Sequence, residues 1–337
     1  MSPRLIRALA AALLACAALL AACGEKEEAL GPRGTSELEL MLDYFPNADH
    51  AGIYAAKAGK HFEQAGLDVK IRQPADPAAP IKQVAAGRVD LALSYEPEVL
   101  RARDQGLSVV AVGALVRRPL TSIISLPKAG IRSPKDLEGK TVGTSGIDYQ
   151  SAYLREILLE AGVDPASVKE RNVGFSLTPA LLAKRVDAIL GGFWNYEGTE
   201  LRLKQRDPRI IRVDDAGVPT YDELVLVANE DALERDGGRI RAFIGALARG
   251  TGDLRKSPGK GIQGLLRANP DLDPELQRAV VKVTLPLLLP GRKRPFGFQD
   301  PEEWQEFVAW MRENRLVTKI PDASGAFTND YLPGAGF

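Results

Sequence analysis

Short apolar runs alternate with amphipathic segments over most of the chain. An apolar run at residues 38–42 is followed by a polar turn, by a segment at 51–64 and by a second apolar run at 67–71. Pro46 and Asn47 stop regular structure in the turn, and either Asp49 or Asn47 can cap the helix that follows. This order predicts a strand, a helix and a strand, which is the repeating unit of an open α/β sheet.

The same alternation continues towards the carboxyl end. Further strands are predicted at 88–94, 108–115, 121–126, 140–143, 168–173, 186–191, 210–213 and 221–228. Further helices are predicted at 80–86, 97–104, 133–137, 149–161, 178–184, 239–256, 261–268, 274–285 and 301–315. The residues after 317 are rich in Gly, Pro and Asp and predict an irregular tail.

Two extended segments, near 120–127 and 219–228, divide the predicted elements into two sets. We therefore expect an α/β fold with two lobes joined by a two-strand hinge. The first lobe is discontinuous and takes residues 38–127 and 219–337, and the second takes residues 128–218.

The amino-terminal residues have the pattern of an export signal. Arg4 and Arg7 precede an apolar run at 8–22, which is too short for a full membrane span and fits a secretory signal at 1–22. The residues around Cys23 resemble a bacterial lipobox, which implies cleavage before Cys23 and its acylation. An ordinary signal with an incidental cysteine is the alternative.

Lipidation at Cys23 would fix where the mature protein resides. Residues 23–37, with their Glu, Gly, Pro and Ser, then form a flexible tether. We expect a protein anchored to the outer face of a membrane, on the periplasmic or extracellular side. Cys16 is a weaker candidate because it would leave a very short apolar region.

Charge and cysteine content exclude several classes of function. The chain has 44 basic and 44 acidic residues, so removal of Arg4 and Arg7 leaves 42 against 44, a net charge of −2. A nucleic-acid-binding domain would be strongly basic. The mature chain would hold no thiol, which excludes disulfides, thiolate catalysis and cysteine-based metal sites. We expect no metal, no cofactor and a monomer.

Aromatic, amide and acidic residues follow three of the predicted strands. Ligands of open α/β sheets bind at the carboxyl ends of strands. A flat heteroaromatic ring is held between aromatic faces, and an exocyclic amine by a carboxylate. The candidate ligand-binding residues are Asp43, Tyr44, Asn47, His50, Tyr95, Glu96, Ser145, Tyr149, Trp194, Asn195, Glu197 and Tyr221.

Other interpretations of these residues remain open. A tyrosine in such a segment is often a packing residue with its hydroxyl satisfied. Asp43 could cap a turn, and Glu197 could occupy the first turn of a helix, where an acid is favoured. The turn at 143–146 either offers free N–H groups to a ligand or is a plain tight turn.

Three blocks identify a family that the chain resembles. Residues 42–54, LDYFPNADHAGIY, are similar to the motif D-W-x-P-N-x-x-H-x-G-x-Y of the ThiY-like branch of type II periplasmic binding proteins. The blocks SYEPE at 94–98 and GFWNYEG at 192–198 agree with it. Tyr44 stands where the family often has tryptophan, and Ala48-Asp49 where it often has Thr-Asn.

The resemblance implies a receptor of an ABC importer. Such a receptor closes its lobes around a solute and docks on the permease subunits, and this branch binds thiamine pyrimidine precursors such as formyl- or hydroxymethyl-aminopyrimidines. Riboflavin and nitrate- or sulfonate-type solutes are alternatives served by the same fold. Small oxyanions would call for basic side chains or N–H groups rather than rings and acids.

An enzyme of pyrimidine synthesis is the alternative from another class. In the related eukaryotic synthases the motif histidine is consumed as a substrate fragment, and pyridoxal phosphate forms a lysine Schiff base. Those enzymes also need a cysteine-rich iron motif, which the mature chain lacks. His50 is then either a neutral wall of the pocket or a satisfied histidine at a helix start, and Lys57 and Lys60 are solvated.

Overall fold

A computed structural model describes residues 35–288 and 294–334. The expected signal at 1–22, Cys16, the lipidation site Cys23 and the tether up to residue 34 lie outside the described residues. The expected tether extends too far, because Ser36 and Glu37 already pair with Leu67 and Asp68 of the neighbouring strand. No helix within the described ranges is long and apolar enough to cross a membrane.

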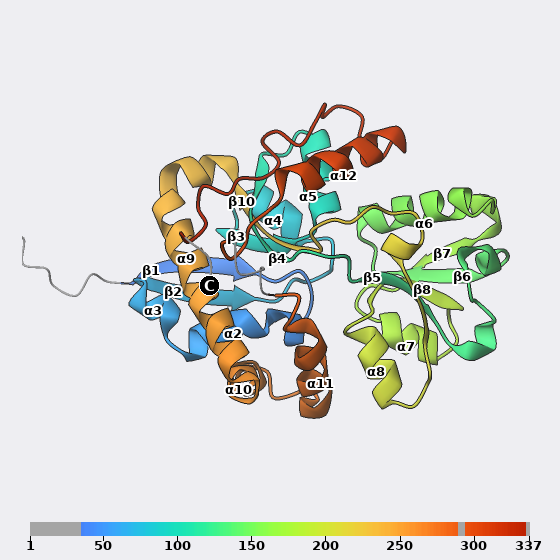
Figure 1. The fold of residues 1–337 in the computed structure, drawn as a ribbon, viewed down its shortest axis with the longest axis horizontal. Coiled ribbons are helices and arrows are strands. Elements are labelled where there is room, and N and C mark those ends of the chain that lie inside the picture. The colour runs from blue at the N-terminus through green and yellow to red at the C-terminus, as the bar shows by residue number, and fades with distance from the viewer. Residues whose placement is uncertain (1–34, 289–293, 335–337) are drawn as a thin grey trace, which may run out of the picture. The chain divides into compact units, whose positions relative to one another are not determined.

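Two five-stranded sheets organise the described chain (Figure 1). The first has the order β2-β1-β3-β10-β4 and the second the order β7-β6-β8-β5-β9. The first contains β1 (Ser36–Met41), β2 (Leu67–Arg72), β3 (Leu91–Ser94), β4 (Val109–Val116) and β10 (Leu224–Asn229). The second contains β5 (Thr121–Ser125), β6 (Thr141–Thr144), β7 (Lys169–Asn172), β8 (Ala188–Phe193) and β9 (Arg209–Arg212).

The two sheets share one plan. In the first, β1 pairs in parallel with β2 and β3, and β10 runs antiparallel to β3 and β4. In the second, β6 pairs in parallel with β7 and β8, and β5 runs antiparallel to β8 and β9. The chain passes between the sheets twice, through residues 117–120 and 216–223. We call the parts built on the two sheets the first and the second lobe.

Helices cover both faces of each sheet (Figure 1). The first lobe has α2 (Ala51–Ala58), α3 (His61–Gln64), α4 (Pro80–Ala85), α5 (Glu96–Asp104), α9 (Glu230–Lys256), α10 (Pro258–Ala268), α11 (Pro274–Thr284) and α12 (Pro301–Glu313). The second has α6 (Asp148–Glu160), α7 (Leu177–Leu182) and α8 (Glu197–Leu203). The 3-10 turns are η1 (Ala48–His50), η2 (Pro127–Ala129), η3 (Pro134–Leu137), η4 (Pro165–Ser167) and η5 (Val213–Asp215).

Helix ends follow the local sequence. Asp273 accepts hydrogen bonds from the backbone N–H groups of Glu275 and Leu276 and starts α11. Asp300 caps α12 in the same way, and each of these helices begins with a proline, which needs no hydrogen-bond partner at that position. Both helices therefore begin where the sequence predicted them.

Three predicted boundaries are wrong. Residues 121–127 were expected in the first lobe, whereas β5 pairs with β8 and β9 of the second sheet. The helix expected at 51–64 is broken at Lys60, whose φ of 59° is left-handed. The helix expected at 239–256 lacks the first segment of α9, which starts at Glu230 with Asn229 as its cap and two acids in its first turn. Asp236, with a non-helical φ of −125° and ψ of 17°, kinks α9 between that segment and the predicted one.

Close backbone packing fixes α2, the helix that follows the predicted site turn. A Cβ added at Gly250 of α9 would lie 2.4 Å from Cα of Ala56, and one at Gly264 of α10 would lie 2.5 Å from the carbonyl oxygen of Tyr54. Only glycine allows these approaches. The turn of residues 43–50, which leads into α2, is therefore held on a rigid support.

Candidate functional site

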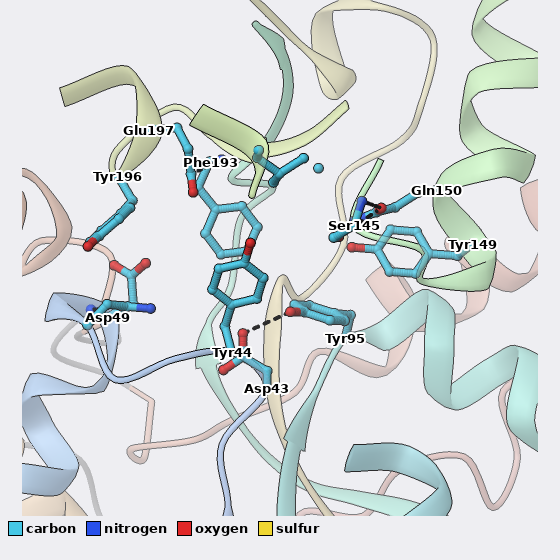
Figure 2. Close-up of a pocket in the computed structure, with 13 residues that line it drawn as sticks. Asp43, Tyr44, Asp49, Tyr95, Ser145, Tyr149, Gln150, Phe193, Tyr196 and Glu197 are labelled. Atoms are coloured by element: carbon cyan, nitrogen blue, oxygen red, sulfur yellow. Dashed lines mark hydrogen bonds between the residues drawn. The ribbon is translucent and has the colours of Figure 1, made fainter. Parts of the chain in front are cut away.

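A small pocket is lined by residues of both lobes (Figure 2). The first lobe contributes Asp43, Tyr44, Asn47, Asp49 and Tyr95. The second contributes Ser145, Tyr149, Gln150, Leu177, Gly191, Phe193, Tyr196 and Glu197. The first-lobe residues follow β1 and β3, and most of the second-lobe residues follow or end β6 and β8. The pocket therefore forms where strand ends of the two sheets meet.

Asp43 is held in place by two donors. The hydroxyl of Tyr95 donates to Oδ2 over 2.8 Å (Figure 2), and Nε2 of His50 lies 2.8 Å from Oδ1. Nδ1 of His50 accepts the backbone N–H of Asn47 over 3.2 Å, so Nε2 carries the proton that is donated to Asp43. Asp43 is 2% exposed and therefore has a fixed orientation beside the pocket.

Aromatic rings from both lobes form much of the lining. The ring of Tyr95 lies 5.6 Å from that of Tyr149 and 6.5 Å from that of Phe193, between centroids. Tyr44 packs against Phe175, with centroids 4.7 Å apart in an edge-on geometry. Figure 2 shows Tyr44, Phe193 and Tyr95 around the middle of the pocket. These rings can hold a flat solute by stacking.

Glu197 is the acidic residue that the second lobe contributes to the pocket lining. It is the first residue of α8, and its Oε2 accepts the backbone N–H of Phe193 over 2.7 Å. Burial raises the pKa of Glu197 to about 8. At neutral pH the group is largely a neutral acid, which can donate a hydrogen bond to a ring nitrogen.

Ser145 and Gln150 hold each other. The hydroxyl and the backbone N–H of Ser145 both donate to Oε1 of Gln150, over 2.9 Å each. The backbone N–H of Ser145 is therefore hydrogen-bonded within the protein. This favours the plain tight turn over a turn that offers this N–H to a ligand. Gly191 makes room for this amide, because a Cβ there would lie 2.3 Å from Nε2 of Gln150.

Seven of the twelve predicted site residues line the pocket. They are Asp43, Tyr44, Asn47, Tyr95, Ser145, Tyr149 and Glu197. His50 does not; it is fully buried and satisfied by Asp43 and Asn47, which agrees with the second of the two roles expected for it.

Trp194 and Asn195, expected to contact the solute, lie elsewhere. The indole N–H of Trp194 donates to the carbonyl of Pro119 over 3.1 Å, and the guanidinium of Arg212 covers its ring at 5.3 Å. Asn195 donates to Asp49 and Thr284 across the lobes. These partners turn both side chains away from the pocket lining.

Glu96 and Tyr221 belong to the connection between the lobes. Oε2 of Glu96 accepts the backbone N–H of Asp222 over 2.7 Å. The hydroxyl of Tyr221 donates to Oε2 of Glu223 over 3.0 Å, and its ring packs on Phe307. Both side chains form hydrogen bonds that stabilise the connection at residues 216–223, and neither lines the pocket.

Six lining residues were missed. Phe193 and Tyr196 lie inside the predicted block 192–198, but Trp194 was selected as the ring of that block that contacts the solute. Asp49 was interpreted only as a helix cap. The remaining three, Gln150, Leu177 and Gly191, sit in ordinary helix or strand sequence that carries no local signal for a site.

Comparisons with known proteins agree with the fold and with the sequence motif. The family described as NMT1/THI5 like matches residues 47–260. The chain is 35% identical to the formylaminopyrimidine-binding protein of Halalkalibacterium halodurans over 320 residues, which cover 94% of this chain and 97% of that protein. It is 25% identical to the 4-amino-5-hydroxymethyl-2-methylpyrimidine phosphate synthase of Legionella pneumophila, over 88% of this chain and 93% of that one.

Solved structures share the architecture at low sequence identity. The alkanesulfonate-binding protein SsuA of Xanthomonas axonopodis, solved with MOPS bound, superposes with a TM-score of 0.67 at 18% identity, covering 88% of this chain and 99% of that one. The likeness confirms the expected periplasmic-binding-protein fold. With a family match over most of its length and a relative at 35% identity, the chain belongs to the NMT1/THI5-like family.

Proposed function

We propose that the protein is the solute-binding component of an ABC importer and captures a formyl- or hydroxymethyl-aminopyrimidine between its lobes. The observation that carries the proposal is the 35% identity, over nearly the whole chain, to a formylaminopyrimidine-binding protein. Lobe closure around the solute, followed by docking on permease subunits, would be the mechanism.

The chemistry of the pocket supports an amine-bearing heteroaromatic solute. Within residues 35–288 and 294–334, the lining holds three carboxyl groups, those of Asp43, Asp49 and Glu197, and no lysine, arginine or histidine. Sulfonate and nitrate are anions, and such a lining repels them. An aminopyrimidine carries donors for carboxylate oxygens and ring nitrogens that accept a hydrogen bond from a neutral acid.

The size of the pocket does not rank the candidate solutes. The cavity in this arrangement of the lobes has a volume of about 20 Å³, which is room for about one water molecule. An aminopyrimidine or riboflavin would therefore enter while the lobes are further apart, and the ranking of the two rests on the identity to the formylaminopyrimidine-binding protein.

A synthase is the second candidate, because relatives at 23–25% identity carry that name. His50 argues against it, since a histidine consumed in the reaction must reach the reacting groups. Its ring is instead fully buried and engaged by Asp43 and by the N–H of Asn47. Formation of a pyrimidine product with iron, pyridoxal phosphate and oxygen would establish the enzyme instead.

The cellular setting is part of the proposal. We propose a monomer attached by lipid on Cys23 to the outer face of a membrane, with the lobes free to meet the permease. Radiolabelled palmitate incorporation that is lost in Cys23→Ala and kept in Cys16→Ala would test the anchor. Incorporation that persists in Cys23→Ala would reject it.

Direct binding tests the cargo. Isothermal titration with formylaminopyrimidine, 4-amino-5-hydroxymethyl-2-methylpyrimidine, riboflavin, taurine and nitrate should give heat with the aminopyrimidines alone. A ligand at 100 times its dissociation constant should also stabilise the fold by about 2.7 kcal/mol in thermal unfolding. The absence of binding by either aminopyrimidine would reject this cargo.

A further inference from the structure

Three side chains connect the two lobes beside the pocket. Nδ2 of Asn195, in the second lobe, donates to Oδ1 of Asp49 and to Oγ1 of Thr284, over 2.7 Å each. Oγ1 of Thr284 in turn donates to Oδ1 of Asp49 over 3.0 Å. Asp49 belongs to η1 and Thr284 ends α11, so both acceptors are in the first lobe. The directions of the three bonds are mutually consistent, because the hydroxyl accepts once and donates once.

Burial makes this cluster strong. Asp49 is 3% exposed, and Asn195 and Thr284 are fully buried. Burial raises the pKa of Asp49 to about 6, so the carboxylate is mostly ionised at neutral pH and both bonds to Oδ1 are charge-assisted. A second contact between lobes lies beside it, where Nε2 of Gln277 donates to the hydroxyl of Tyr196 over 3.1 Å.

Only one of the two carboxylate oxygens of Asp49 accepts a hydrogen bond among the described residues. Oδ1 takes two hydrogen bonds, whereas Oδ2 is buried without a hydrogen-bond partner among the described residues. Asp49 also lines the pocket. A buried carboxylate oxygen without a donor costs free energy, which a donor on a bound solute would recover.

We propose that Asp49, Asn195 and Thr284 form a latch that holds the lobes closed, and that Oδ2 of Asp49 accepts a hydrogen bond from a donor of the solute. The second part rests on the proposed function, since it takes an amine- or amide-bearing solute. One carboxylate then couples the two events. A donor on Oδ2 favours the ionised form, and the ionised form strengthens the bonds of Oδ1 across the lobes. The binding of a donor-bearing solute and closure therefore stabilise each other.

Three substitutions separate the parts of the latch. Asn195→Ala removes the donor from the second lobe and should leave the lobes more open. Asn195→Asp keeps the size and places a second carboxylate beside Asp49, which should open them further by repulsion. Asp49→Asn keeps one acceptor for Asn195, but it removes the charge and replaces the other oxygen by an amide that cannot accept. Closure should therefore weaken less than in Asn195→Ala, while solute binding weakens.

Small-angle X-ray scattering without solute measures how far the lobes are closed, and so tests the latch. Titration with formylaminopyrimidine measures the dissociation constant, and so tests the coupling of closure to binding. We expect a larger radius of gyration for Asn195→Ala and Asn195→Asp than for the wild type and for Asp49→Asn. We expect the dissociation constant to rise by about tenfold or more in Asp49→Asn and Asn195→Ala, which is about 1.4 kcal/mol per factor of ten. Thermal unfolding of each variant establishes that it is folded.

Thr284→Val and Thr178→Val form a matched pair. Thr178 is buried in the second lobe, and its hydroxyl has no partner in the part of the chain that the structure describes. The first should open the lobes, and the second should behave as wild type. Equal radii for wild type, Asn195→Ala and Thr284→Val would overturn the latch. If no aminopyrimidine binds the wild type, the proposed cargo and the proposed hydrogen bond from the solute to Oδ2 of Asp49 are both rejected. The scattering result still shows whether the latch holds the lobes closed.

Discussion

The hydroxyl of Tyr95 lies 2.8 Å from Oδ2 of Asp43 and joins the ends of two neighbouring strands. Asp43 follows β1 and Tyr95 follows β3, and these strands run parallel in the first sheet. His50 occupies the other oxygen of Asp43. The orientation of the carboxylate is thus set from both the sheet and the turn, before any solute arrives.

Tyr95→Phe should weaken both folding and binding. The ring is kept, but Oδ2 of Asp43 loses its buried donor, which should lower the free energy of unfolding by about 1–3 kcal/mol. Urea unfolding measures this change, and titration with formylaminopyrimidine should show a higher dissociation constant. Tyr331→Phe, at a half-buried tyrosine outside the pocket, is the control. A Tyr95→Phe protein as stable as the control would show that the hydrogen bond contributes nothing.

The two aromatic blocks are expected to differ in importance. Tyr44 lines the pocket, whereas Trp194 is covered by Arg212 and tied to Pro119. Tyr44→Ala should remove a stacking face and weaken aminopyrimidine binding by about 1–3 kcal/mol. Trp194→Phe should change the dissociation constant by less than about twofold. The reverse order in calorimetric titration would mean that Trp194 contacts the solute.

Glu96→Gln tests the assignment of Glu96 to the connection between the lobes. Glu96 is fully buried, and burial raises its pKa well above the usual value, so the neutral glutamine should replace it with little loss of stability. The amide oxygen can still accept the N–H of Asp222. Melting temperature and aminopyrimidine affinity should both stay near those of the wild type. A large loss of affinity with an unchanged melting temperature would place Glu96 at the solute after all.

The sequence predicted the fold better than the identity of the site residues. Alternating apolar and amphipathic segments indicate α/β units because a buried strand and a half-buried helix differ in period. Strand ends also carry the site, so composition at the ends of β1, β3 and β8 located its three blocks. Which ring within a block faces the solute depends on contacts far along the chain. Trp194 is turned by Pro119 and Arg212, and Asn195 by Asp49 and Thr284.

The pH dependence of folding should reveal the buried acids. Burial raises the pKa to about 8 for Glu197 and to about 7 for Glu98, Asp222 and Glu223. Between about pH 4.5 and pH 8, the folded protein therefore retains protons that the unfolded chain has released. Unfolding releases these protons, so the free energy of unfolding should fall as the pH rises through this window, and acidification from about pH 8 to pH 5 should stabilise the protein.

Glu197→Gln isolates one of these groups. The amide oxygen can still accept the N–H of Phe193, but no charge forms at high pH. The difference in unfolding free energy between variant and wild type should be small near pH 5 and should shift in favour of the variant by up to about 1.4 kcal/mol per pH unit towards pH 8. Urea unfolding at each pH measures it, with Glu200→Gln on the same helix, half-buried beside Lys204, as the control. Parallel curves for Glu197→Gln and wild type would mean that Glu197 is already ionised in the folded protein at neutral pH, and that it meets the solute as a carboxylate acceptor rather than as a neutral donor.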